Sequence, residues 1–170
     1  MILRSALLML AIPALAACAT GPALQAHTAS YPQAALFDAT ANATEDLVGA
    51  RVESVAQGTR VLVVFGANWC HDSLALAGWL QTPRFAALVS PSFEVVYIDA
   101  GVPQTGQGRN LDLAAQYGVS DITGTPAVLV LDTDGTLLNT PEDARSWRNA
   151  ASRSEDEIYA FLSHWAKPAV

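Results

Sequence analysis

The residues of this chain best suited to covalent chemistry lie in the stretch Trp69-Cys70-His71-Asp72-Ser73. A continuous apolar run ends just before it and a helical spacing begins after the cysteine, which places Cys70 where a strand passes into a helix. Unpaired backbone N–H groups and the positive end of a helix dipole favour the thiolate there, and thiolate is the nucleophilic form of cysteine. The alternative is an inert cysteine that packs as a small apolar side chain. We favour the reactive thiol.

The two residues after Cys70 have opposite effects on a thiolate. A cationic His71 would stabilise it, unless His71 is only an exposed loop residue, whereas Asp72 would oppose it. We expect Asp72 to offset the helix dipole in the first turn, in preference to pairing with His71. Consecutive ligands cannot surround a metal ion, and His27 and His164 lie far away along the sequence, so we expect no metal site. We also expect no cofactor.

The elements that must position Cys70 alternate along the chain. Apolar runs at residues 61–67 and 93–100 predict strands buried on both faces, and residues 71–80 predict the helix that follows the cysteine. Before the first strand, Val48, Val52 and Val55 at helical spacing predict a helix from Asn42 to Gly58.

The remaining elements follow in chain order. A short helix is expected from Pro83, and a loop at 101–109 leads to a helix that is capped by Asn110 and ended by Gly118. A strand at 127–131 precedes a turn at Asp134-Gly135 and a returning strand at 136–138. The last helix follows the capping box Ser154 to Glu157.

The N-terminal residues indicate export rather than fold. Arg4 precedes a short apolar run, and Leu15-Ala16-Ala17-Cys18 resembles a bacterial lipobox, in which the cysteine is acylated. We therefore expect a signal peptide at residues 1–17, a lipidated Cys18 with a tether at 18–30, and one domain at 31–170. The alternative is ordinary cleavage after Ala16 or Ala26. The apolar run is too short to favour a permanent membrane span.

Composition limits the other possible partners. The chain has 170 residues, of which 51% are hydrophobic, which suits one well-cored domain. Its formal net charge is -7 and its nine basic residues are scattered, so nucleic acid is not an expected partner. We expect a lipoprotein of the bacterial cell envelope that faces the periplasm. Ala19, in place of the aspartate that often signals retention in the inner membrane, favours the outer membrane.

Two motifs at matching places in this order of elements resemble the thioredoxin superfamily. They are Trp69-Cys70 after the first buried strand and Gly124-Thr125-Pro126 before the third. The resemblance covers about residues 35–167. It implies an α/β, three-layer thioredoxin-like fold, with a central mixed sheet and helices on both faces. It also implies a cis peptide bond at Pro126, which would face Cys70 while the backbone of Thr125 holds an extended peptide.

Three departures from the family pattern concern the second half of a dithiol cycle. Ser73 stands where dithiol members have their second cysteine, so an internal thiol cannot resolve a mixed disulfide at Cys70. Ser73 is expected either to donate a hydrogen bond to the thiolate or only to cap the helix. Val64 replaces a buried aspartate that many thioredoxins carry, and residues 95–97 lack the lysine that often accompanies it.

These observations support two hypotheses about function. In the first, Cys70 attacks a protein or low-molecular-weight disulfide as a monothiol, and an external thiol releases the resulting mixed disulfide. In the second, the fold keeps the groove around Pro126 as a binding module for a peptide or protein and performs no turnover. We favour the first, because a pure binding module has no evident need of a cysteine at a helix N-terminus.

Overall fold

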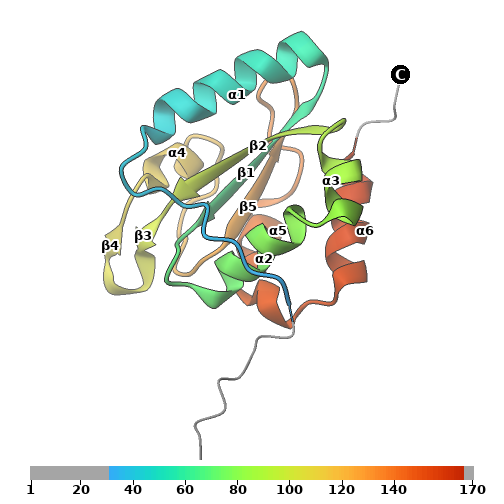
Figure 1. Ribbon diagram of the computed structural model, residues 1–170. Helices are drawn as coiled ribbons and strands as arrows, with labels where there is room; N and C mark the ends of the chain where they lie inside the picture. Colours follow the sequence, from blue (N-terminus) through green and yellow to red (C-terminus); the bar gives the residue numbers. More distant parts are fainter. Residues whose placement is uncertain (1–30, 167–170) are drawn as a thin grey trace, which may run out of the picture.

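The computed structural model describes residues 31–166, which are built around a three-stranded sheet of order β2-β1-β5 (Figure 1). The central strand β1 (Arg60–Gly66) pairs in parallel with β2 (Phe93–Asp99) and antiparallel with β5 (Ala127–Leu131). All three strands lie within a residue of their expected positions. The prediction of a mixed sheet is confirmed.

Helices cover both faces of this sheet, as expected (Figure 1). On one face lie α1 (Ala43–Gln57) and α4 (Leu111–Ala115). On the other lie α2 (His71–Leu80), α3 (Pro83–Val89) and α6 (Glu155–Trp165). Successive side chains of a strand point to opposite faces, so β1 contributes alternate apolar residues to two separate cores. This explains why its sequence is continuously apolar.

The apolar spacing in α1 predicted a helix correctly but does not mark its buried face. Val48, Val52 and Val55 are 55%, 65% and 64% exposed. The residues of α1 that are buried include Ala43 and Leu47. The helix bounds follow their signals, because Asn42 Oδ1 accepts a hydrogen bond from the Glu45 N–H at 3.3 Å and Gly58 ends the helix with φ 69°.

One expected cap is wrong. Asn110 precedes α4 but adopts a left-handed backbone, with φ 57°, and its side chain makes no capping hydrogen bond to the helix. Its side-chain amide instead donates to the carbonyl of Asp99 at 2.9 Å. The preference of asparagine for left-handed backbone decides this outcome. The helix itself is shorter than expected, and Gly118 follows it with φ 79°.

Two segments have more structure than the sequence indicated. The expected loop at 101–109 contains a short hairpin, β3 (Gly101–Val102) and β4 (Gln107–Gly108), joined through a turn of 3-10 helix. Before α6 lie α5 (Pro141–Arg145) and a 3-10 helix (Ser146–Ser152). The returning strand expected at 136–138 is reduced to one bridge, between Leu131 and Leu137.

The segment before α1 runs along α2, and Gly78 makes this approach possible. Ala34 N–H donates to the Leu74 carbonyl at 3.1 Å, and a Cβ at position 78 would overlap the backbone of Pro32 and Gln33. A helical glycine normally costs about 1 kcal/mol relative to alanine. At position 78, the overlap of an alanine Cβ with backbone atoms should cost more than the helix propensity that alanine would gain.

We therefore expect Gly78→Ala to lower the free energy of unfolding by about 1–3 kcal/mol, measured by urea denaturation. Gly49→Ala in α1 is the matched control, since beyond the adjoining turns of its own helix no atom lies within 4 Å of the new Cβ. That change is expected to stabilise by about 0.5–1 kcal/mol. Stabilisation by both changes would contradict the close packing of residues 32–34 on α2.

The expected capping box at the start of α6 is confirmed. Glu157 N–H donates to Ser154 Oγ at 3.3 Å, and the Ser154 N–H donates to Glu157 Oε2 at 2.7 Å. The backbone bond from Ser154, followed by its side-chain bond, lowers the pKa of Glu157. A lowered folded-state pKa stabilises the protein above the unfolded value, and the stabilisation is lost as pH falls through the folded value.

The Ser154→Ala variant should therefore raise the pKa of Glu157 toward the ordinary value of a glutamate. An NMR titration of the side-chain carboxyl would measure this. Because the substituted alanine retains its backbone N–H, the shift should be partial. A pKa of Glu157 unchanged by the substitution would show that the side-chain bond contributes nothing to it.

The predictions made for the N-terminal segment lie outside the described residues. They comprise the signal peptide, the lipidated Cys18 and the tether. Within residues 31–166, no helix combines the length and apolar character that crossing a membrane requires.

Candidate active site

Cys70 lies at the junction of β1 and α2, as predicted. It is the N-cap residue of α2, with extended backbone at φ -92° and ψ 117°, and its N–H donates to the Ala67 carbonyl at 3.0 Å. Its thiol donates to the carbonyl of Thr125, with Sγ and O 3.2 Å apart. The residue is 6% exposed and therefore buried.

The loop before β5 forms the other side of the site. The Thr125–Pro126 peptide bond is cis, as the family resemblance implies, and Cys70 faces this loop through the bond to Thr125. A cleft of about 310 Å³ runs between the two segments. Five of the predicted site residues line it: Trp69, Cys70, His71, Gly124 and Thr125. The rest of the lining consists of Asp72, Gln104, Thr123 and Arg148, whereas Ser73 and Pro126 are not part of it.

The backbone of this loop has unused hydrogen-bonding groups. Within residues 31–166, the N–H groups of Gly124 and Thr125 donate to no protein acceptor. Backbone groups that border a cleft can pair with an extended peptide in the manner of an added strand. The side-chain hydroxyl of Thr125 is also buried without a partner among the described residues.

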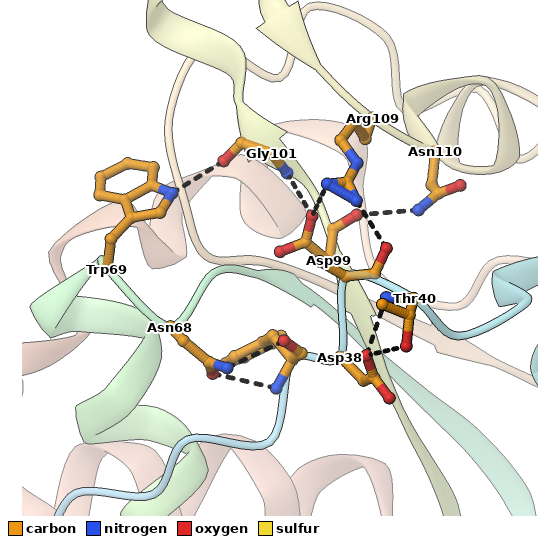
Figure 2. Close-up of polar contacts among 10 residues, drawn as sticks. Asp38, Thr40, Asn68, Trp69, Asp99, Gly101, Arg109 and Asn110 are labelled. Carbon is orange, nitrogen blue, oxygen red and sulfur yellow. Dashed lines mark hydrogen bonds and ion pairs between the residues drawn. The ribbon is translucent and has the colours of Figure 1, made fainter.

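Trp69 borders the cleft and is held by the hairpin that follows β2 (Figure 2). It is 52% exposed, and its indole N–H donates to the Gly101 carbonyl at 3.0 Å. The Gly101 N–H in turn donates to Asp99 Oδ1 at 3.0 Å, and Arg109 lies 3.6 Å from the same carboxylate oxygen. Asp99 thus ties the hairpin to the end of β2.

The hairpin is therefore held in place by hydrogen bonds beside the cleft and is not a free connector. Arg109 also donates to the Ala39 carbonyl at 2.6 Å, which links the hairpin to the segment before α1. Asn68, which precedes Trp69, exchanges two hydrogen bonds with the backbone of Phe37 in that segment (Figure 2). This network was not predicted from the sequence. The available signal was an acidic residue at the end of a strand, Asp99, with Arg109 ten residues later.

His71 and Asp72 combine both of the arrangements considered for them. Asp72 lies in the first turn of α2, as preferred, but it also pairs with His71, whose Nε2 is 3.0 Å from Asp72 Oδ2. The His71 side chain is exposed, while Asp72 is buried. The second carboxylate oxygen accepts a hydrogen bond from the Ala151 N–H at 2.8 Å.

Comparison with known proteins agrees with this geometry. Residues 42–133, more than half of the chain, match the model of a family described as thioredoxin-like. The chain belongs to the thioredoxin-like family. It is also similar to the crystal structure of a disulphide isomerase from Xylella fastidiosa Temecula1, with 34% identity over 77% of this chain and 96% of the other, and a TM-score of 0.68. The comparison with curated proteins found no match.

The thioredoxin-like site departs from a dithiol site at Ser73. The Ser73 side chain is fully buried one helical turn beyond Cys70, and its hydroxyl has no hydrogen-bond partner among the described residues. Both expected roles, donation to the Cys70 sulfur and capping of α2, are therefore wrong. The hydroxyl lies instead toward Gly66 in β1, where a Cβ would be 2.9 Å from it.

The other two departures are located where the thioredoxin resemblance placed them. Val64 is fully buried in β1 and contributes to the core beneath α2. Val95 and Tyr97 of β2 pack partly against the same core, and Val96 lies in the core on the other face of the sheet. Within residues 31–166, no group of three or more histidine, cysteine or acidic side chains could hold a metal ion.

Asp72 is expected to stabilise the thioredoxin-like site through its bond to Ala151. Asp72→Ala would leave a partly buried N–H unpaired and should lower the free energy of unfolding by about 1–3 kcal/mol. Asp72→Asn keeps an acceptor oxygen and should lose less. Chemical denaturation of the two variants provides the measurement, and equal losses would show that the hydrogen bond to Ala151 is not the cause.

Proposed function

We propose that this protein carries out thiol-disulfide exchange, with Cys70 as a monothiol nucleophile. The observation that supports it most directly is the placement of the Cys70 sulfur at the start of α2, against the carbonyl of Thr125 and beside the cis-Pro126 loop. Cys70 is a free thiol, and Ser73 stands where a resolving cysteine would be. The similarity to a protein described as a disulphide isomerase agrees with this chemistry.

The reaction has two exchanges. The Cys70 thiolate attacks one sulfur of a substrate disulfide, a bond forms between Cys70 and that sulfur, and the other sulfur leaves as a thiolate that takes a proton from water. An external thiolate, such as that of glutathione or a partner cysteine, then attacks the substrate sulfur and expels Cys70. The number of disulfides is unchanged, so the protein shuffles partners without net oxidation or reduction.

The bond between Cys70 and Thr125 couples this chemistry to peptide binding. The Thr125 carbonyl accepts a hydrogen bond from the Cys70 thiol in the resting state, and it loses that donor when Cys70 becomes a thiolate or part of a mixed disulfide. A buried carbonyl without a donor is unfavourable. A peptide N–H from the substrate can replace the donor, while the free N–H groups of Gly124 and Thr125 donate to the peptide. Exchange and strand addition then favour each other.

We further propose that the protein is a lipoprotein of a bacterial envelope, attached through Cys18 and facing the periplasm. The lipobox-like Leu15-Ala16-Ala17-Cys18 supports this, and Ala19 favours the outer membrane. In that arrangement Cys70 is the single unmodified thiol of the mature chain, since the sequence has two cysteines. Mass spectrometry of the membrane-extracted protein would show an acylated N-terminal Cys18; cleavage after Ala16 or Ala26 would exclude it.

The exchange reaction is tested with purified protein carrying Cys18→Ser, so that Cys70 is its single thiol. It is incubated with oxidised glutathione between about pH 6 and about pH 9, which brackets the ordinary thiol pKa of about 8.5. Intact-mass measurement should show one glutathione adduct, which added thiol removes. The additional substitution Cys70→Ser should abolish the adduct. Absence of any adduct over the whole range would overturn the proposal.

A binding module without turnover is the second candidate. The unused backbone N–H groups beside the cleft favour it, because peptide binding at Gly124 and Thr125 requires no sulfur chemistry. The Cys70→Ser variant distinguishes the two candidates. If it retains proteins from an envelope extract as well as the parent does, binding is the function. Covalent capture that depends on Cys70 would support exchange.

A further inference from the structure

Arg148 borders two adjoining clefts beside Cys70. One is the cleft that contains Cys70, and the other, of about 360 Å³, is also lined by Asp121, Glu142 and Arg145. Both clefts are lined by Thr123, Gly124 and Arg148. The side chain of Arg148 extends along this loop, since a Cβ on Gly124 would lie 3.6 Å from its Cβ and 3.7 Å from its Cδ.

Arg148 differs from the other arginines in residues 31–166 by having no partner for its guanidinium. Each of the others has at least one acceptor: Arg51 bonds to Asp134 O, Arg60 pairs with Asp132, Arg84 with Glu155 and Asp156, Arg109 with Asp99, Arg145 with Glu142 and Ser120 O, and Arg153 bonds to Ser146. An exposed, unpaired cation on a protein of net charge -7 is available to a ligand.

The acidic groups that line the two clefts with Arg148 have other partners. In the Cys70 cleft, Asp72 pairs with His71 and accepts from Ala151. In the second cleft, Glu142 pairs with Arg145, and Asp121 interacts with the adjacent Ser120 hydroxyl at 3.5 Å. None of these carboxylates bonds to Arg148. The arginine therefore offers its planar set of N–H donors to a group from outside, and this set matches a carboxylate.

We infer that Arg148 is an anion subsite of the exchange reaction, which favours disulfides carrying a carboxylate beside the reacting cysteine. The inference rests on the proposed function. Because Arg148 and Cys70 line one cleft of about 310 Å³, the carboxylate must belong to a residue close to the sulfur that Cys70 attacks. An acidic residue next to a protein cysteine meets this requirement, and so do the carboxylates of glutathione.

The test compares two disulfide-linked peptides, acetylated and amidated at their ends, which differ only in Glu or Gln beside the cysteine. Stopped-flow measurement of mixed-disulfide formation should give a rate constant about tenfold higher for the Glu peptide, the effect of one charged hydrogen bond. Arg148→Gln should remove this preference. Arg148 is exposed and unpaired, so the variant is expected to fold, and thermal denaturation checks it.

Arg51→Gln is the matched control. It changes the net charge equally but lies on α1, on the opposite face of the sheet, and it should keep the preference. Oxidised glutathione forms a separate arm. A dependence on Arg148 with glutathione alone would identify low-molecular-weight disulfides as the carboxylate source, whereas a dependence with the Glu peptide would identify protein cysteines. Either dependence supports the subsite.

Failure of the inference is distinguishable from failure of the exchange reaction. Equal rates for the Glu and Gln peptides, with adducts formed and glutathione also unaffected by Arg148→Gln, would overturn the subsite and leave exchange intact. If no adduct forms with any disulfide, exchange fails, and the subsite is tested without it. Calorimetry with the corresponding serine peptides would then show Arg148-dependent binding of the Glu form, or overturn the subsite.

Discussion

The Ser73→Cys variant is expected to release its own mixed disulfide, whereas the proposed monothiol reaction requires an external thiol to release that of the parent protein. Residues three apart in a helix are neighbours, so a thiol at position 73 lies one turn from Cys70. It can attack the Cys70 sulfur, form a disulfide between Cys70 and the introduced cysteine, and expel the substrate as a thiolate. The intramolecular attack should shorten the lifetime of the adduct by orders of magnitude, given the effective concentrations of well-placed groups.

The measurement is the decay of a preformed glutathione adduct in thiol-free buffer, followed by intact mass. Ser73→Ala is the control, because it removes the unpartnered hydroxyl and introduces no thiol. Its adduct should persist like that of the parent. An adduct of Ser73→Cys that also persists would show that Ser73 is not in the position of a resolving cysteine. Val64 remains in place of the usual aspartate, so the variant should stay slower than a dithiol enzyme.

The second large effect is expected at Trp147, which lies in the 3-10 helix between β5 and α6. Trp147 is fully buried, its ring meets Phe161 edge-on with centroids 4.6 Å apart, and the Arg153 guanidinium lies 4.1 Å above it. Trp147→Ala should lower the free energy of unfolding by about 3–5 kcal/mol. That is a large share of the roughly 5–15 kcal/mol typical of a folded domain.

Trp147→Phe provides the comparison in urea denaturation. Phenylalanine keeps an aromatic ring against Phe161 and removes an indole N–H that has no partner among the described residues. It should therefore cost less than the alanine variant. The alanine variant should also slow adduct formation at Cys70, because the 3-10 helix carries Ala151, the donor to Asp72. Equal losses of stability from the two variants would contradict a role for aromatic packing.

Local signals predicted the main elements because those signals act over a few residues. The apolar runs that became β1 and β2, the capping box at Ser154 and the strand-to-helix junction at Cys70 all depend on neighbours in the chain. The α1 stripe shows the limit of such signals. The spacing of Val48, Val52 and Val55 is helical, but it does not say which side of the helix meets the sheet.

The 3-10 helix before α6 and the hairpin after β2 were missed for a related reason. Their residues have little periodicity, and distant contacts hold them. Asp72 bonds to Ala151, and Arg109 reaches Ala39 across the fold. Nothing in the spacing of these residues along the chain indicates that they meet.

The sequence by itself determined the chemistry available to this thioredoxin-like protein: a single candidate thiol at a helix N-terminus, a cis-proline motif to face it, and no resolving cysteine at Ser73. Residue identity and local order place the cysteine at the helix N-terminus, and the resemblance to thioredoxins implies the cis-proline and the role of position 73. Only the tertiary structure decided what surrounds the thiol, because it brings the Thr125 carbonyl to Cys70 and Arg148 to the same cleft. Those neighbours arise from the packing of separate elements, which depends on shape and burial over the whole domain.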